Sequence, residues 1–284
     1  MGTDIASCPR VDERKPLRSR VMRVSPVRRC RPDQANRCGR NFRASRFLVA
    51  ALLLLLSCPA RAETVDLNLV IAVDVSDSID TEELSLQRQG YANAFVRPEI
   101  VEAIKSGTNG RIAVAYFEWS DSSEQTLVVD WTIINDQASA QAFSARLQRA
   151  PIRKGHFTSI SAAISYGLAL LRRSPHQVDR KVIDISGDGR NNDGPPLPPV
   201  RAAAISWDVT INGLPIENER SQESGHLLPG QIAQYYREEV IGGPNAFVVV
   251  AKSFADIERA ISRKLLREIA GEASPEAPGK AAAR

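Results

Sequence analysis

Hydrophobic positions between residues 65 and 270 follow two patterns, short apolar runs and helical periodicities. The runs predict strands over 65–73, 111–117, 125–133, 181–185, 208–211 and 246–251. Helical spacing and composition predict helices over 81–95, 98–105, 138–147, 159–171, 200–205, 228–236 and 254–269. Strands that alternate with helices indicate an α/β fold. We therefore expect a Rossmann-like, doubly wound, mostly parallel six-stranded sheet with helices on both faces, in which the alternating 125–133 run forms one antiparallel edge strand.

The N-terminal region has the pattern of a targeting segment. Residues 47–56 (FLVAALLLLL) form an apolar run that is too short to span a bilayer as a helix. Arg43 and Arg46 precede it, and Ala60 and Ala62 occupy the two small-residue positions of a cleavage site. Residues 1–62 are therefore expected to be a basic leader with a secretory signal that is removed after Ala62. A buried core helix is the alternative for the run, and lipid attachment through Cys58 is a minor alternative for the leader.

Charge and cysteine are distributed unevenly along the chain. Its 284 residues contain 37 Lys and Arg against 33 Asp and Glu, a net charge of +4. Residues 1–62 alone carry +10 and all four cysteines, so the remaining 222 residues carry −6 and no cysteine. Broad attraction to polyanions such as nucleic acid is therefore not expected. The sequence predicts an exported domain over 63–271, periplasmic or extracellular and without a stable membrane span, followed by a disordered Pro/Ala/Gly-rich tail over 272–284.

Polar side chains follow two of the predicted strands. Asp74, Ser76 and Ser78 come after the first strand, and Asp188 stands between two glycines after the fourth. Ligand sites of such sheets lie beyond the carboxyl ends of the strands. Two buried carboxylates need compensation, which a hard cation such as Mg²⁺ (or Mn²⁺ or Ca²⁺) supplies while taking oxygen ligands. The other interpretation is a polar loop in which Asp74 or Ser76 caps the next helix.

These residues resemble a known site. DVSDS after a hydrophobic strand, a threonine opening the third main helix and Asp-Gly after the fourth strand are similar to the metal-ion-dependent adhesion site of von Willebrand factor type A domains, over about residues 65–270. The phrases ISGDGRNN and INGLPI resemble an exported bacterial subfamily of unassigned function. The resemblance implies a metal at the top of the sheet with an open position for an acidic group of a protein partner. The ligands that it implies are Asp74, Ser76, Ser78, Thr158 and Asp188.

The chain departs from the family pattern at two positions. Two bulky residues separate Gly155 from Thr158, and capping of the 159–171 helix is an alternative role for Thr158. Asp184 lies inside a predicted strand, so it needs a buried partner such as a Lys, an Arg or a backbone amide.

Three further residues are candidates for the rim of the site. Glu118 ends a predicted strand, while Asn191 and Asn192 lie in a polar loop and have turn formation as their alternative.

The leading function is a binding module, with an assembly factor for an envelope complex and a metal-dependent hydrolase as alternatives. An enzyme is not expected, because Ser76 stands where such a hydrolase places its second acid, and neither G-x-S-x-G nor a P-loop occurs.

Overall fold

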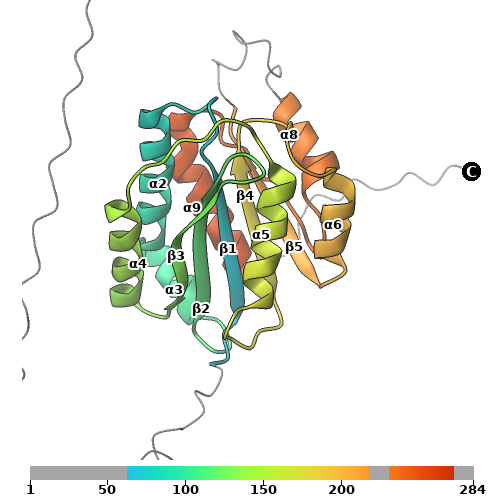
Figure 1. The fold of residues 1–284 in the computed structure, drawn as a ribbon. Coiled ribbons are helices and arrows are strands. Elements are labelled where there is room, and N and C mark those ends of the chain that lie inside the picture. Colours follow the sequence, from blue (N-terminus) through green and yellow to red (C-terminus); the bar gives the residue numbers. More distant parts are fainter. Residues whose placement is uncertain (1–62, 218–229, 272–284) are drawn as a thin grey trace, which may run out of the picture. The chain divides into compact units, whose positions relative to one another are not determined.

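Five strands form one mixed sheet at the centre of the described part of the chain (Figure 1). The computed structural model describes residues 63–217 and 230–271. The strands are β1 (Leu67–Asp74), β2 (Ile112–Trp119), β3 (Gln125–Ile134), β4 (Lys181–Gly187) and β5 (Val209–Pro215), in the order β3-β2-β1-β4-β5. β1 pairs in parallel with β2 and β4, β5 pairs in parallel with β4, and β3 is the antiparallel edge strand that the alternation predicted.

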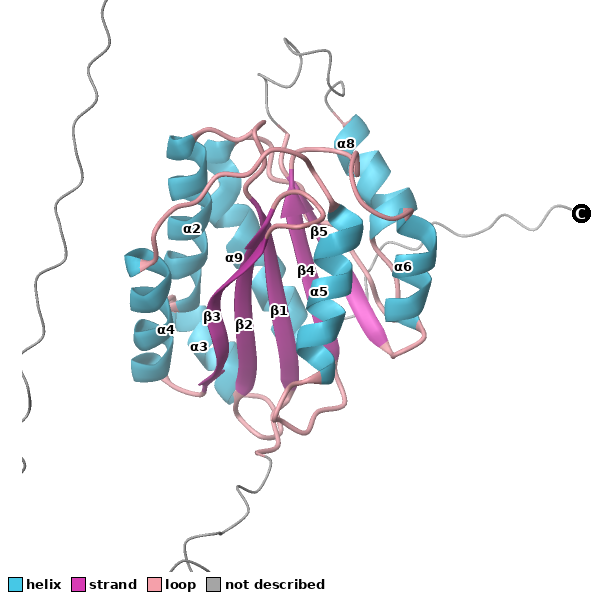
Figure 2. Ribbon diagram, viewed as in Figure 1, coloured by secondary structure: helices cyan, strands magenta, loops and turns pink. Residues whose placement is uncertain are grey.

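Helices cover both faces of this sheet, as the alternation of elements predicted (Figure 2). On one face lie α2 (Thr81–Phe95), α3 (Pro98–Lys105), α4 (Gln137–Arg149) and α9 (Ile257–Ala270). On the other lie α5 (Ile160–Arg172), α6 (Leu197–Ile205) and α8 (Gln231–Tyr235), which runs on into the π-helical turn η2 (Tyr236–Val240). A short 3₁₀ turn, η3 (Phe254–Asp256), precedes α9. The two faces of β1 show how one strand serves both layers, because Leu69 packs on the first side and Val70 on the second.

The expected sixth strand over 246–251 is not a member of the sheet. The segment runs beside β5 and is joined to it by backbone hydrogen bonds such as Gly213 N to Phe247 O (3.0 Å) and Ala251 N to Pro215 O (3.0 Å), but these form only isolated bridges, Gly213 with Val248 and Ile216 with Ala251. Two features interrupt the ladder. Pro215 has no N–H to donate across the pair, and the N–H of Phe247 donates to the side-chain Oδ1 of Asn212 (3.1 Å) rather than to a backbone carbonyl. The prediction of six strands was therefore wrong, because hydrophobicity alone does not reveal a missing donor in the neighbouring strand.

The described helices also bear on membrane association. Within residues 63–217 and 230–271, no helix combines the length and the apolar character needed to cross a bilayer. The predicted leader (1–62) and tail (272–284) lie outside the described residues, so those two predictions stay untested.

Candidate metal-binding site

The two aspartate loops meet at the carboxyl end of the sheet. Asp74 ends β1, Asp188 follows β4, and these two strands are direct parallel neighbours. The Ser78 hydroxyl donates a hydrogen bond of 2.6 Å to Asp188 Oδ1, across 110 residues of sequence. The structure therefore brings together the residues that the sequence placed on separate loops, while their role as metal ligands stays a prediction.

The loop after β1 brings its side-chain oxygens close together. The backbone N–H of Ser76 donates to Asp74 Oδ1 (2.8 Å), which bends the chain back over the end of β1. The hydroxyls of Ser76 and Ser78 lie 3.2 Å apart. Carboxylate and hydroxyl oxygens thus line one small region, the donor set that a hard divalent cation takes.

The electrostatics of the site fit a bound cation. Asp74 is fully buried, and its Oδ2 has no hydrogen-bond partner. Burial, and then the nearby charge of Asp188, raise the pKa of the Asp74 carboxyl well above its usual range. A cation between the two carboxylates removes both penalties, because it offsets the lost hydration and the like-charge repulsion. Over residues 63–217 and 230–271 no three His, Cys, Asp or Glu side chains form a metal cluster, so hydroxyls would have to supply the remaining protein ligands.

Thr158 lies beside the second loop. Its Oγ1 is 3.3 Å from the position that a Cβ on Gly189 would occupy. Thr158 and Asn192 exchange two hydrogen bonds of 2.9 Å, from Thr158 N to Asn192 Oδ1 and from Asn192 N to Thr158 O. Ser159, not Thr158, is the N-cap of α5, since its side chain accepts from Ala162 N. The capping role considered for Thr158 therefore belongs to its neighbour, and ligation by Thr158 stays a prediction.

The two asparagines proposed for the rim hold the loop after β4, with Asn191 half-buried and Asn192 exposed. Asn191 Oδ1 accepts from Ser161 N (2.9 Å), and its Nδ2 donates to the Asp193 carbonyl (3.0 Å). Asn192 Oδ1 accepts the hydrogen bond from Thr158 N described above. Both side chains fasten the loop after β4 to the start of α5, and their place on the rim stays a prediction.

Glu118 is buried, in a pair with Arg88. Both Nε (2.9 Å) and Nη2 (2.6 Å) of Arg88 donate to Glu118 Oε1, and Nη2 also reaches Oε2 at 2.8 Å. Burial raises the pKa of the Glu118 carboxyl, and the hydrogen bonds from Arg88 oppose that rise. Glu118 lines a hollow at this end of the sheet, but its carboxylate is buried and paired with Arg88, so its role at the rim stays a prediction.

Tyr236, which the sequence did not single out, lies behind the site. A Cβ on Gly187 would lie 2.7 Å from Asp74 Oδ2 and 2.9 Å from the Tyr236 hydroxyl, so the glycine leaves both oxygens room. The hydroxyl is fully buried without a hydrogen-bond partner. Burial, followed by the charges of Asp74 and Asp188, raises the pKa of the phenol well above its usual range, which keeps it a neutral O–H donor. The residue comes from the π-helical turn, a local irregularity that no sequence pattern marked.

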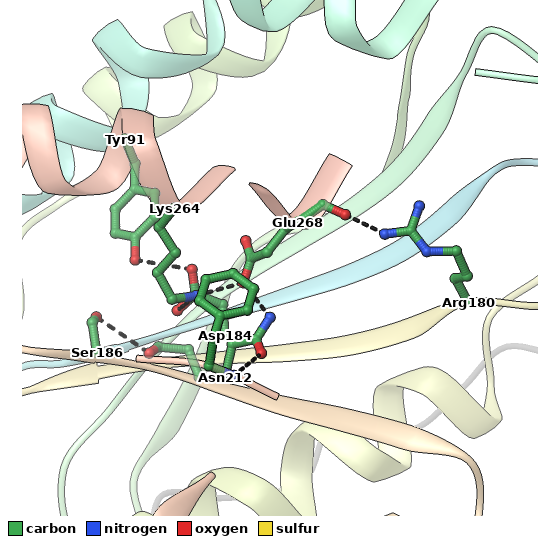
Figure 3. Close-up of polar contacts among 9 residues, drawn as sticks. Tyr91, Arg180, Asp184, Ser186, Asn212, Lys264 and Glu268 are labelled. Carbon is green, nitrogen blue, oxygen red and sulfur yellow. Dashed lines mark hydrogen bonds and ion pairs between the residues drawn. The ribbon is translucent and has the colours of Figure 1, made fainter. Parts of the chain in front are cut away.

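Asp184 has the buried partner that its position required. Lys264 Nζ on α9 lies 2.6 Å from Asp184 Oδ1 and 2.5 Å from Glu268 Oε1 (Figure 3). Tyr91 donates to Asp184 Oδ2 at 3.5 Å, and Asn212 Nδ2 donates to Glu268 Oε1 at 3.0 Å. This network ties α9 to β4 and β5 beneath the sheet, so β4 is fixed by buried polar contacts before it reaches the Asp188 loop.

Comparisons with known proteins bear on the family and the fold. The DUF1194 family, described as a protein of unknown function, matches residues 64–273. None of the curated proteins matches the chain significantly. Among solved structures, proximal thread matrix protein 1 from the mussel byssus, with a zinc-occupied MIDAS motif, has a TM-score of 0.53 and 15% identity over 74% of this chain and 49% of that one. The pilus adhesin SpaC from Lactobacillus rhamnosus GG has a TM-score of 0.51 and 14% identity over 74% of this chain and 31% of that one.

These likenesses establish the fold and the family, and they go no further. The chain spans about half the length, or less, of the two solved proteins, whose identities to it are low. The fold is that of a von Willebrand factor type A domain, in agreement with the motif resemblance in the sequence. The family match covers the whole described domain, and the chain belongs to the DUF1194 family.

Proposed function

We propose that residues 63–271 form an exported binding module that holds a divalent cation, Mg²⁺ in the first instance, between the loops after β1 and β4. Asp74, Ser76, Ser78, Thr158 and Asp188 would hold the ion. When bound, the ion would offer an open position to a carboxylate of a protein partner, which gives the contact direction as well as affinity. The similarity to a matrix protein with a metal-occupied motif and to a pilus adhesin supports a binding role.

One observation carries the proposal. The Asp74 carboxyl is fully buried with one oxygen unpartnered, and the charge of Asp188 bears on it from the neighbouring loop. Such an arrangement is costly in the absence of a counter-charge. The other oxygen, Asp74 Oδ1, is paired with Ser76 N, so Oδ2 is the one left for a cation.

An assembly factor that uses the same site on a protein of an envelope complex is a second candidate, which differs only in its partner. A metal-dependent hydrolase is the third, and it has less support, because Ser76 occupies the position of the second acid and makes a hydrogen bond to Ser78. Turnover of a generic phosphoester by the purified protein, lost in Asp74→Ala, would move the assignment to the hydrolase.

Metal binding is tested by titration calorimetry with MgCl₂ and MnCl₂. Wild type should bind one ion, and Asp74→Ala should not. Asp130→Ala is the matched control, because Asp130 is an exposed aspartate of the edge strand β3. Equal binding by wild type and Asp74→Ala would remove the site as assigned.

The partner and the compartment need separate measurements. Capture of proteins from envelope extract, with and without chelator, tests whether binding depends on the metal; a partner retained equally under both conditions would contradict the binding mode. Mass spectrometry of the exported protein tests the leader, for which we expect Glu63 as the first residue. A lipid on Cys58 would replace that expectation with a lipoprotein.

A further inference from the structure

The loop over residues 151–157 (PIRKGHF) presents apolar side chains next to the candidate site. Phe157 is 59% exposed, the largest fraction among the exposed large hydrophobic residues of the described chain, and Ile152 is 41% exposed. Phe157 directly precedes Thr158, one of the candidate ligands. An exposed apolar side chain is ordinary when it stands alone, whereas two on one short loop beside a binding site indicate a contact surface.

Backbone hydrogen bonds hold this loop against the metal-site loop. Gly155 N donates to the Val75 carbonyl (2.8 Å), and Asp77 N donates to the His156 carbonyl (3.3 Å). Gly155 also allows a close approach, because a Cβ there would lie 1.9 Å from the Ser120 hydroxyl oxygen. The middle of the loop is therefore fixed to the chain segment that carries Ser76 and Ser78.

Both ends of the loop are fixed as well. The buried Arg88 donates to the carbonyls of Ala150 (2.5 Å) and Pro151 (3.2 Å), where the loop begins. After the loop, Ser159 N donates to the Ser120 carbonyl (2.7 Å). Phe157 thus stands between anchored neighbours, and its exposure is built into the fold, which lowers the entropy lost when a partner covers it.

The loop carries Arg153 and Lys154 and no carboxylate, a charge that suits an acidic partner. Asp77 forms an ion pair with Lys154 (3.7 Å), and its Oδ2 lies 3.0 Å from His156 Nδ1. Arg153 is exposed, and its charge opposes the rise that burial causes in the pKa of the nearby Glu118 carboxyl, which is itself paired with Arg88. Together with Val75, Glu118 and Glu124 it lines a hollow of about 600 Å³ beside the loop. The surface therefore offers an apolar tip and an exposed guanidinium next to the place where the metal would sit.

We infer that the partner is a protein segment in which an acidic residue that reaches the metal is followed closely by an apolar side chain that packs on Phe157 and Ile152, with a further acidic group drawn to Arg153. This inference rests on the proposed function, and it deepens it by naming the chemistry of the partner. Phe157 is the residue that sets specificity, because a carboxylate on a ligand without apolar groups, such as an acidic polysaccharide, leaves it uncovered.

The experiment is a selection from a phage-displayed library of random short peptides on the full chain in MnCl₂, with elution by chelator. The selected peptides are synthesised, and their affinities are measured by fluorescence anisotropy for wild type, Asp74→Ala and Phe157→Ala. Trp207→Ala is the matched control, because Trp207 is an aromatic residue with 47% exposure that lies before β5, at the amino end of the sheet.

We expect peptides that combine an acidic with a nearby apolar residue. Phe157→Ala should weaken their binding about tenfold, as truncation of an aromatic anchor commonly does, and Trp207→Ala should leave it unchanged. Loss of binding in Asp74→Ala but not in Phe157→Ala, or selected peptides that are acidic without apolar residues, would overturn the inference and leave the proposed function in place. Undiminished binding by Asp74→Ala would instead overturn the proposed function.

Discussion

The buried network beneath the sheet makes stability depend on pH in a way that one substitution should remove. Asp184, Lys264 and Glu268 are all fully buried, so two carboxylates share one ammonium. Burial raises the pKa of Glu268 from 4.5 to about 7; Lys264 opposes the rise, and the charge of Asp184 adds to it. Near neutral pH the folded protein therefore holds a proton that the unfolded chain has already released.

Proton linkage gives the sign and the size of this pH dependence of the free energy of unfolding. Between pH 4.5 and about 7 the folded state binds more protons at Glu268 than the unfolded state does, so the free energy of unfolding falls as the pH rises through this window. At 1.36 kcal/mol for each pH unit, the whole interval corresponds to ~3 kcal/mol. In Glu268→Gln this contribution is absent. The loss of stability between about pH 5 and 8 should therefore be ~2–3 kcal/mol smaller in the variant than in wild type.

The assay is urea unfolding followed by circular dichroism at several pH values between about 5 and 8, with chelator present throughout. Glu102→Gln on α3 is the control, because Glu102 forms only a surface ion pair with Lys105 and should leave the pH profile unchanged. Parallel profiles for wild type and Glu268→Gln would refute the reasoning. As a second arm, Lys264→Met leaves two buried carboxylates without their cation and should cost about 3–5 kcal/mol at pH 8, and less at pH 5.

Three further substitutions test the surroundings of the candidate site. Tyr236→Phe should lower Mn²⁺ affinity in calorimetry by up to about tenfold, because supporting groups behind a ligand orient it; Tyr116→Phe, another buried phenol without a hydrogen-bond partner, should leave the affinity unchanged. Gly187→Ala should weaken the same binding more strongly, since its methyl group would lie 2.7 Å from a carboxylate oxygen of the aspartate that ends β1; an unchanged affinity would contradict this role of the glycine. Arg88→Met should cost about 3–5 kcal/mol in urea unfolding at pH 7, because it leaves the buried Glu118 carboxylate without its cation; a cost below about 1 kcal/mol would show that the pair is not needed for folding.

Local patterns in the sequence determined most of the elements and the place of the chemistry. The helix over 81–95 has the bounds that its composition predicted, and a capping box of Asp80 and Glu83 fixes its start. β1 ends at Asp74, as the apolar run before this residue indicated. These features are readable because helical and strand periodicities, caps and strand ends depend on residues within a few positions of one another.

The tertiary structure decided what depends on residues far apart in the chain. It brings the Ser78 hydroxyl into hydrogen-bond contact with Asp188 and supplies Lys264 as the partner of Asp184. It likewise brings Tyr236 behind the aspartate that ends β1. It also excludes 246–251 from the sheet, because the ladder needed a donor that Pro215 lacks. No pattern within one segment encodes such contacts, because a buried charge or an unmade hydrogen bond is satisfied by whichever distant group packing brings within about 3 Å.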